Sequence, residues 1–403
     1  MSIDVSGSSA ERMPERLVVA GVAMCGDGYP NAANTIALLK RELRCEIRDQ
    51  AYWLPPNVRL WHLVKGSALK RVTLATRLGV GGLFQAARLL LGQRASDVVY
   101  LPYPAPLTLW WLSIIPRGWR PRCIADAYIS LWDSMFRDRG GGDVRGVVSR
   151  IVRRFEARSL RAAALVLVDT EANKRQMIAD FALSARRIRS IPLAINERLF
   201  PSSGREQAPS DRPARVLFVG TLVPLHGIDI VLAVAAELSK SDGIEFRLIG
   251  DGQQSALVEA FVRTGNVAGF TWIREWMPLA DIAREIEEAD VCLGVFGGEG
   301  KAARVLPFKS YCALAAGKAI VTQAAHSLPD GLPPLPAVLV AGTDRQKWAR
   351  DVAAAIRTLI ESRAERIALG NTAGQYFADH LSSQAIRAAW QEILCAANGR
   401  MDD

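Results

Sequence analysis

The sequence predicts an α/β protein built from two doubly wound domains. Short apolar runs of strand length alternate with longer segments of helical periodicity along most of the 403 residues. The alternation is broken by PSSGREQAPSDRPA at 201–214, whose proline, serine, glycine and charged residues are typical of a linker. The pattern then starts again. We therefore expect two parallel sheets, each covered by helices on both faces, on either side of this linker.

The first domain is expected over residues 16–200, after a disordered leader at 1–15. It opens with the apolar run RLVVAGVA, a glycine-containing turn and a helical segment, which together form the first unit of a doubly wound sheet. The later strand-like runs are CEIRDQA at 45–51, DVVYLPY at 97–103, RCIADAY at 122–128, ALVLVDT at 164–170 and IRSIPLAI at 188–195.

The second domain is expected over residues 215–380, followed by a C-terminal helix at 381–403 that is able to cross back to the first domain. Asp344 has the position of an N-cap, and an apolar helical face follows it. The strand-like runs are RVLFVG at 215–220, IEFRLIG at 244–250, VAGFTWI at 267–273, DVCLGVFG at 290–297, KAIVTQ at 318–323 and AVLVA at 337–341. The residues of the apolar face are Trp348, Val352, Ile356, Leu359 and Ile360.

Composition indicates a globular protein that works in the cytoplasm. Half of the residues are hydrophobic and 23% are charged, and no uncharged apolar run is long enough to cross a membrane. The N-terminal sequence lacks the order of a secretory signal. The six cysteines form no C-x-x-C pair and the four histidines are scattered, so neither disulfides nor a zinc site are expected.

The net charge of +9 is distributed unevenly. Residues 1–200 contain 30 Lys and Arg against 17 Asp and Glu, whereas residues 201–403 contain 20 against 24. The basic half indicates an anionic partner, which is phosphate, a lipid headgroup or nucleic acid. The alternative is that the surplus arginines only solvate helix faces.

The segment RVLPFKSYCALAAGKAIVT at 304–322 places cations at the start of a helix. Pro307 suits the first helical turn, and Lys301, Arg304 and Lys309 lie around it. Cations are unfavourable at the positive end of the helix dipole unless an anion lies between them. The cluster therefore predicts a bound phosphate. The alternative is that these side chains are solvated on a loop.

Two further turns follow strands of the second domain. After RVLFVG, the loop from Thr221 to His226 leads into a helix, and its free N–H groups favour an anion. After the next strand, Gly250 and Gly252 flank Asp251 and would let the backbone approach a flat ligand. Each turn has a purely structural alternative, as a loop or as a strand-to-helix connection.

These segments together resemble a known family. The stretches VGTLVPLHGIDIVL, LIGDGQ, EWMPLADIAREIEEADVCLGVFG and KAARVLPFKSYCALAAGKAIVT are similar, in order and spacing, to the donor half of glycosyltransferase family four. CIADAYISLWDSMFRDRG and ALVLVDT are similar to a bacterial surface-polysaccharide branch of that family. The resemblance implies the GT-B fold, in which two Rossmann-like domains face each other across a cleft. It also implies a retaining enzyme that holds a nucleotide-diphosphate sugar on the second domain and an acceptor on the first.

The resemblance also implies donor-site residues. Thr221 and His226 stand where the family has an arginine and a lysine, so Lys301, Arg304 and Lys309 are expected to stabilise the diphosphate. The family's two glutamates fall on Arg304 and Cys312, which leaves Ser310 or a backbone group to hold the ribose. The base is expected near Trp276 and Met277, with plain core packing of Trp276 as the alternative. The backbone amides expected to face the phosphates lie around the stretch Val305 to Phe308, which also contains Leu306 and Pro307.

In the first domain, the turn of Gly26, Asp27 and Gly28 resembles the family's glycine loop that approaches the diphosphate. Asp126 falls where many relatives carry an active-site histidine and is expected to bind sugar hydroxyls or steer the acceptor, the alternative being a structural carboxylate. Asp133 and Arg139 are further candidates for acceptor or phosphate contact.

The resemblance suggests front-face substitution, and the sequence contains no D-x-D stretch to hold a divalent ion, so metal-independent transfer is expected. The expected donor is a UDP- or GDP-sugar, and the acceptor a glycan, a lipid-linked molecule or a small molecule, but not nucleic acid. PLTLWWLSIIPRGWR, with Trp110, Trp111 and Trp119, would either rest on an anionic membrane as a peripheral contact or form a buried helix. A nicotinamide-dependent dehydrogenase is disfavoured because no G-x-G-x-x-G follows the first strand. A two-lobed sugar-binding protein without catalysis remains the rival.

Overall fold

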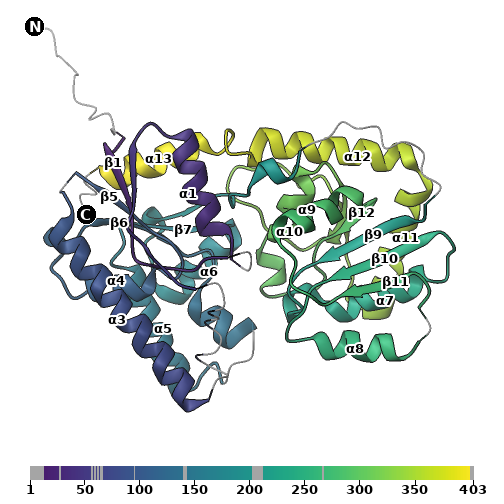
Figure 1. The fold of residues 1–403 in the computed structure, drawn as a ribbon, viewed down its shortest axis with the longest axis horizontal. Coiled ribbons are helices and arrows are strands. Elements are labelled where there is room, and N and C mark those ends of the chain that lie inside the picture. The colour runs from purple at the N-terminus through teal and green to yellow at the C-terminus, as the bar shows by residue number, and fades with distance from the viewer. Residues whose placement is uncertain are drawn as a thin grey trace, which may run out of the picture.

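The computed structural model describes residues 13–26, 29–55, 58, 60, 63, 67–94, 96–138, 143–201, 212–265 and 267–399. Within these residues two six-stranded parallel sheets lie side by side along the long axis of the molecule, as Figure 1 shows. The sequence-based prediction of two doubly wound, Rossmann-like domains is confirmed. The predicted linker at 201–214 lies mostly outside the described residues, as does most of the leader.

The N-terminal sheet has the strand order β3-β1-β5-β6-β7-β8. Three of its central strands, β1, β5 and β7, are buried at every residue, as expected for parallel strands covered on both faces. The strands are β1 (Arg16–Val19), β3 (Glu46–Asp49), β5 (Val98–Leu101), β6 (Arg122–Asp126), β7 (Leu165–Val168) and β8 (Ile188–Ser190). A separate parallel pair is formed by β2 (Val22–Ala23) and β4 (Tyr52–Trp53).

Helices cover both faces of this sheet. They are α1 (Asn31–Glu42), α3 (Ala68–Gly92), α4 (Pro106–Leu112), α5 (Val147–Leu160) and α6 (Glu171–Phe181). A short π-helix, η2 (Asp133–Asp138), follows β6 and points toward the other half of the molecule. Short 3-10 turns are η1 (Arg117–Trp119), η3 (Ala185–Arg187) and η4 (Glu197–Leu199).

The C-terminal sheet has the strand order β11-β10-β9-β12-β13-β14. Its strands are β9 (Ala214–Val219), β10 (Ile244–Ile249), β11 (Phe270–Ile273), β12 (Val291–Leu293), β13 (Ala319–Gln323) and β14 (Val338–Val340). Its helices are α7 (Ile228–Leu238), α8 (Ser255–Arg263), α9 (Leu279–Glu288), α10 (Phe308–Ala315) and α11 (Arg345–Glu361), with 3-10 turns η5 (Pro224–His226) and η6 (Ala302–Arg304). The Asp344 side chain accepts a hydrogen bond from the Lys347 N–H, which confirms the predicted N-cap of α11.

The chain ends on the N-terminal sheet. After α12 (Arg363–Tyr376) and the π-turn η7 (Phe377–Leu381), α13 (Arg387–Asn398) packs against β5 and β6. Trp390 of α13 is buried edge-on against Tyr100 of β5, with ring centroids 5.8 Å apart. In Figure 1, α12 and α13 run across the top of both halves. Among the described residues, no helix combines the length and hydropathy needed to cross a bilayer.

Candidate active site

The carboxyl edge of the C-terminal sheet contains a topological switch point. The strand order reverses between β9 and β12, and ligands of open α/β sheets bind at the carboxyl ends of the strands at such a point. The loops that follow these two strands meet there, because the Phe296 N–H donates a hydrogen bond of 3.1 Å to the His226 carbonyl. The fold itself therefore places the His226 loop where a ligand is expected.

Lys309 brings a buried amine to this point. It lies in the first turn of α10, and its Nζ lies 3.5 Å from the ring centroid of Phe218 on β9. The Nζ atom is covered and has no hydrogen-bond partner, and burial lowers the pKa of this ammonium well below its ordinary value. A Cβ atom at Gly220, the residue after β9, would stand 3.1 Å from Nζ, so a larger residue there would displace the Lys309 side chain.

His226 lies close to the Lys309 side chain, and Ser310 is the next residue after Lys309 in the chain. The His226 ring donates from Nδ1 to the Thr221 carbonyl, and burial together with the charge of Lys309 lowers its pKa well below the ordinary value, so the ring is neutral. The hydroxyl of Ser310, a residue only 2% exposed, has no hydrogen-bond partner. Buried polar groups normally find partners. Two adjacent residues of α10 with free donors therefore indicate a site that an anionic or polar ligand completes.

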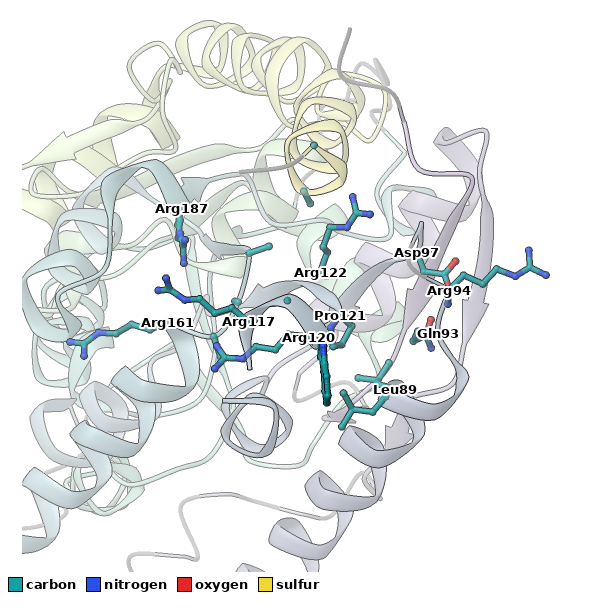
Figure 2. A pocket seen from close by; sticks show the side chains of 18 residues that line it. Leu89, Gln93, Arg94, Asp97, Arg117, Arg120, Pro121, Arg122, Arg161 and Arg187 are labelled. Carbon is teal, nitrogen blue, oxygen red and sulfur yellow. The ribbon is translucent and has the colours of Figure 1, made fainter. Parts of the chain in front are cut away.

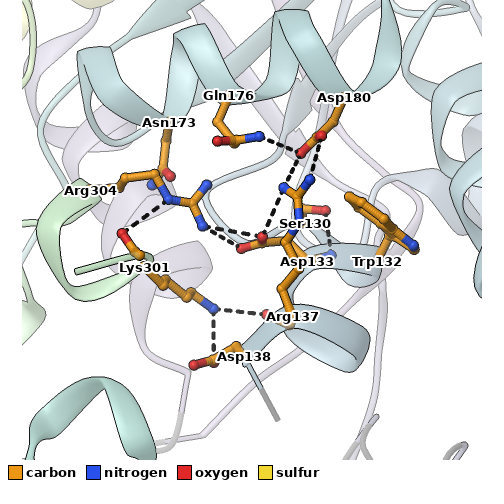
Figure 3. Close-up of polar contacts among 12 residues, drawn as sticks. Ser130, Trp132, Asp133, Arg137, Asp138, Asn173, Gln176, Asp180, Lys301 and Arg304 are labelled. Carbon is orange, nitrogen blue, oxygen red and sulfur yellow. Dashed lines mark hydrogen bonds and ion pairs between the residues drawn. The ribbon is translucent and has the colours of Figure 1, made fainter. Parts of the chain in front are cut away.

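Lys301 and Arg304 have partners within the protein, which is a finding that the sequence did not indicate. The Arg304 guanidinium binds both carboxylate oxygens of Asp133 at 3.0 and 3.1 Å. Lys301 Nζ lies 3.1 Å from the Asp138 carboxylate and 3.0 Å from the Ser134 hydroxyl. Figure 3 shows these contacts, which join the two halves of the molecule. The anions that stabilise these two cations here are carboxylates of η2.

The predicted turn after β10 packs against the turn after β9. A Cβ atom at Gly250 would lie 2.1 Å from the Gly220 carbonyl oxygen, so this glycine permits contact between two backbones. The Asp251 carboxylate binds the Ser255 hydroxyl and the Gly252 N–H and lies 3.3 Å from Arg274, and the bond to Ser255 is the largest cause of its lowered pKa. The structure therefore gives Asp251 a local role at the start of α8.

The remaining predicted donor residues lie along the same edge. Val305, Leu306 and Pro307 connect η6 to α10, and Pro307 is the N-cap residue of α10. Phe308 and Met277 are partly buried against the core, whereas Trp276 is 58% exposed. Cys312 is 2% exposed, and burial raises the pKa of its thiol, so it packs as a neutral apolar side chain.

In the N-terminal half, Asp126 ends β6 in full burial. Its carboxylate accepts hydrogen bonds from the Tyr128 N–H at 3.1 Å and the Tyr100 hydroxyl at 3.3 Å, and burial raises its pKa to about 7. With 0% exposure it reaches no ligand in this arrangement, so contact with a sugar stays a prediction. Gly26 has a φ of +91°, which suits a tight glycine turn. Asp27, Gly28 and Arg139 lie outside the described residues.

The sequence reasoning missed the carboxylates on the N-terminal side of the junction apart from Asp133. Asp138 pairs with Lys301, and Asp169, which follows β7, accepts a 2.7 Å hydrogen bond from Asn173 with its pKa raised by burial to about 6. Asp133 and Asp138 are five residues apart and would point in different directions on an α-helix. On the π-helix η2 they share one side. The position of Asp169 directly after an apolar strand was a sequence signal that could have identified it as a candidate site residue.

A large cavity lies far from this edge. It has a volume of about 670 Å³ and opens at the amino ends of β5, β6 and β7, where Figure 2 shows arginine side chains around it. Its arginines are Arg94, Arg117, Arg120, Arg122, Arg161 and Arg187. Because ligands of parallel sheets bind at the carboxyl edge, the junction and not this cavity is the candidate active site. Among the described residues, no group of three His, Cys, Asp or Glu side chains is placed to hold a metal ion.

Comparison with known proteins gives structural neighbours only. No protein-family model and no curated protein sequence matches the chain. HepE from Anabaena, solved with UDP-glucose, superposes with a TM-score of 0.62 at 16% identity, over 95% of this chain and 99% of that one. The E. coli trehalose-6-phosphate protein bound with UDP-2-fluoro glucose gives a TM-score of 0.66 at 14% identity, over 94% and 99%.

A third neighbour is TarM of S. aureus, solved as a G117R mutant with fondaparinux, alpha-GlcNAc-glycerol and UDP. Its TM-score is 0.55 at 12% identity, over 78% of this chain and 58% of that one. HepE and TarM have two Rossmann-like domains in the GT-B arrangement. With the two switch-point sheets described above, these likenesses show that the chain has the GT-B fold.

Proposed function

We propose that this protein is a glycosyltransferase that moves a sugar from a nucleotide-diphosphate donor, and that Lys309 contacts the diphosphate. The observation that carries the proposal is the buried Nζ of Lys309 at the switch point, which has no hydrogen-bond partner. The hydroxyl of Ser310, the next residue in the chain, has none either. A diphosphate would provide acceptors for both groups and negative charge at the start of α10. The N-terminal half, across the junction, would hold the acceptor.

The proposal extends to donor and family. The three neighbours described above were solved with UDP or a UDP sugar, which favours uridine over guanosine nucleotides as the donor class. The sequence resemblance favours glycosyltransferase family four, retaining, of the surface-polysaccharide branch, acting in the cytoplasm. Six free cysteines are consistent with a reducing compartment. The domain limits at 16–200 and 215–380 are part of the proposal.

The transfer would follow a front-face course. The acceptor hydroxyl oxygen bonds to the anomeric carbon as the bond from that carbon to the diphosphate oxygen breaks, and the acceptor proton passes to the departing phosphate. The main electrostatic task is to stabilise the charge that grows on this oxygen. We assign this task to Lys309, the Ser310 hydroxyl and the first N–H groups of α10, none of which needs a metal ion.

Lys301 and Arg304 would act conditionally. In this structure each is held by a carboxylate of η2, so each reaches a diphosphate only after it leaves Asp138 or Asp133. An exchange of carboxylate for phosphate would then couple donor binding to the separation or rotation of the two halves. The competition implies that these carboxylates weaken donor binding rather than support it.

The direct test is a thermal-shift comparison of UDP with GDP on three proteins. A ligand that binds only the folded state raises the melting temperature, so the wild type should respond more to UDP than to GDP. Lys309→Met should lose this response. Lys318→Met is the matched control, because Lys318 is also buried but precedes β13 at the opposite edge of the sheet and donates to the Glu287 carbonyl. A Lys309→Met protein with the full UDP response would overturn the assignment.

A turnover assay distinguishes the transferase from a two-lobed binding protein without catalysis. The protein would be incubated with a panel of UDP- and GDP-sugars and a range of sugar and lipid acceptors, and free nucleoside diphosphate would be measured. Release that depends on an acceptor supports the transferase. Saturable binding with no release in any combination would favour a two-lobed binding protein.

A further inference from the structure

The outer face of α3 is apolar where a soluble helix is normally polar. Its exposed apolar side chains recur at intervals of three, four, seven and eight residues, so they form one stripe along the helix. The exposed fractions include 78% for Leu69, 64% for Phe84 and 90% for Leu91. The other members of the stripe are Val72, Val80 and Leu83. Nothing in the described part of the chain covers this stripe.

A second helix extends the stripe. Val147, Val148 and Ile151 of α5 are each about 60% exposed. The helix α4 packs against both α3 and α5, which therefore lie on the same side of the N-terminal half, as Figure 1 shows. Among the described residues, thirteen of the eighteen exposed large hydrophobic side chains fall between residues 69 and 151. We call the outer sides of α3 and α5 the apolar face.

Positive charge predominates around the apolar face, and Asp143, just before α5, is an exposed acid beside it. From residue 50 to residue 125 the sequence contains ten Lys and Arg but a single acid, Asp97, which is paired with Arg16. The helix α3 has no acidic residue, and the one acid of α5, Glu156, is buried at 1% exposure. At the C-terminal end of α3, the arginine-lined cavity of Figure 2 continues this charge.

Two arginines of that cavity are held in place by backbone carbonyls. Arg120 donates to the Ser113 and Ile115 carbonyls, and Arg161 donates to the Phe181 carbonyl. Carbonyls orient a guanidinium but do not cancel its charge. The exposed Trp119 and Ile114 lie in the same region. An apolar surface with a cationic surround and aromatic side chains at its edge complements an anionic lipid bilayer.

We propose that the apolar face docks on an anionic lipid bilayer and that an apolar chain from this bilayer enters a cavity that opens on the face. A second copy of the protein is a poorer occupant, because two such faces would bring like charges together. A bilayer instead supplies both the apolar layer and the negative headgroups. The apolar face would then set the orientation of the protein on the membrane.

The cavity has a volume of about 470 Å³ and lies between the helices of the apolar face. Val147 and Val148 line it and are also exposed, so its mouth lies within the face. Its walls include Leu78 of α3, Leu107 of α4 and Phe136 of η2. Apolar enclosures of this size accept ligands of drug size.

The π-helix η2 connects this cavity with the candidate active site. Met135 and Phe136 line the cavity, while Asp133 and Asp138 of the same short helix meet Arg304 and Lys301 at the junction. An amphiphile with its chain in the cavity would therefore place its polar end beside the junction. This part of the inference depends on the proposed transferase function and assigns the acceptor to the lipid-linked class.

Docking is tested by co-sedimentation with vesicles. The wild type should pellet with phosphatidylcholine vesicles that contain about one third phosphatidylglycerol, and much less with phosphatidylcholine alone or at high salt. Val80→Asp with Phe84→Asp changes two exposed side chains and should reduce pelleting to the level of neutral vesicles. The matched control is Leu257→Asp with Val262→Asp on α8, whose side chains are 42% and 49% exposed, and it should pellet like the wild type.

Two results would overturn the docking proposal. The first is a wild type that stays in the supernatant with anionic vesicles at low salt, or a Val80→Asp/Phe84→Asp protein that pellets equally well. The second is a change from dimer to monomer in that variant without vesicle binding by either protein, since the face would then be a contact between two copies.

The cavity is tested with a photoreactive probe. Vesicles would contain a phosphatidylglycerol with a diazirine at the end of its acyl chain, and labelled peptides would be mapped after illumination. Label is expected in 131–136 and 147–155, and Val152→Trp, which fills the cavity, should remove it there while leaving label on α3. Label confined to α3, or a pattern unchanged by Val152→Trp, would overturn the cavity assignment.

The same samples separate this inference from the proposed function. A UDP thermal shift is measured on the wild type and on the Val80→Asp/Phe84→Asp variant, which should respond equally. A protein that responds to UDP without binding vesicles keeps the transferase proposal and loses the membrane inference. A protein that binds vesicles without responding to any nucleotide keeps the membrane inference and loses the transferase proposal.

Discussion

The two sheets of this molecule carry opposite kinds of titratable side chain at their carboxyl edges. At the carboxyl edge of the N-terminal sheet, Asp126 and Asp169 are buried acids with hydrogen-bond donors around them. At the carboxyl edge of the C-terminal sheet, His226 and Lys309 are buried bases, and the Lys309 ammonium has no partner. A buried acid with hydrogen-bond donors around it needs no ligand, whereas a buried amine without a hydrogen-bond partner favours an anionic ligand. The difference indicates which half holds the charged part of the substrate.

The outer surfaces differ as well. The N-terminal half is basic and carries the apolar face of α3 and α5, whereas the C-terminal half has a net negative formal charge in sequence and only scattered exposed apolar side chains. One half thus has the surface that the docking proposal requires, and the other has the edge that the donor-site proposal requires. The predictions below test whether these properties are separable.

The largest expected effect concerns Gly220, where the C-terminal site is most crowded. Gly220→Ala would place a methyl group 2.9 Å from His226 Cε1 and 3.1 Å from Lys309 Nζ, so we expect UDP affinity to fall by more than about tenfold. Isothermal calorimetry measures it. Gly243→Ala is the control, since Gly243 also has a positive φ but has no atom near the added methyl. Equal UDP affinity in both variants would contradict the account.

Asp126, in the N-terminal half, should make the free energy of unfolding depend on pH. Its folded pKa of about 7 lies above the ordinary value, so the folded state holds this proton longer than the unfolded state. The resulting stabilisation is complete in acid and is lost as the pH rises to about 7, by at most about 1.4 kcal/mol per pH unit.

Asp126→Asn removes this dependence. Urea unfolding of the wild type and the variant from about pH 5 to about pH 8 should show that the wild type loses stability relative to Asp126→Asn as the pH rises. Asp169 and Glu156 shift in the same direction but are common to both proteins. Parallel pH profiles would show that Asp126 titrates normally.

Asp133→Asn tests the contact between the halves. Loss of the carboxylate frees Arg304, so we expect a stability decrease of about 1–3 kcal/mol together with tighter UDP binding. Asp180→Asn is the matched control, because Asp180 pairs with Arg137 in the same network without touching Arg304 or Lys301. Weaker UDP binding in Asp133→Asn would mean that this carboxylate supports the donor site rather than competing with it.

The smallest expected effect is that of a chelator. Transfer should continue at the same rate with EDTA and should not rise with added manganese or magnesium, because in the proposed site Lys309 and the start of α10 stabilise the leaving group. The measurement is acceptor-dependent UDP release. A strict requirement for a divalent ion would contradict the assignment of leaving-group stabilisation to Lys309.

The sequence was sufficient for the fold because its signals are local. RVLFVG is apolar after its first residue, and IEFRLIG is apolar apart from Glu245 and Arg247. Short, mostly apolar runs are typical of buried parallel strands, and the structure contains β9 and β10 there. The N-cap at Asp344 was predictable for the same reason, since its hydrogen bond spans three residues.

The site was predictable only in part because its decisive contacts are distant. The residues around the start of α10 were found from charge and proline placement. The pairing of Arg304 with Asp133 joins positions 171 residues apart and depends on how the two halves face each other. The burial of Lys309 against Phe218 depends on side-chain packing that no local pattern encodes. The roles assigned to Asp126, Trp276 and Cys312 remain predictions.

The central claim is that Lys309 receives the diphosphate, and proton uptake measures it most directly. Burial lowers the pKa of Lys309 and a bound diphosphate should raise it, so binding takes up a proton at pH values between the free and the bound pKa. We therefore expect the calorimetric enthalpy of UDP binding to change with the ionisation enthalpy of the buffer in the wild type, and Lys309→Met to bind weakly without such a change. Equal affinity and the same buffer dependence in both proteins would contradict the account.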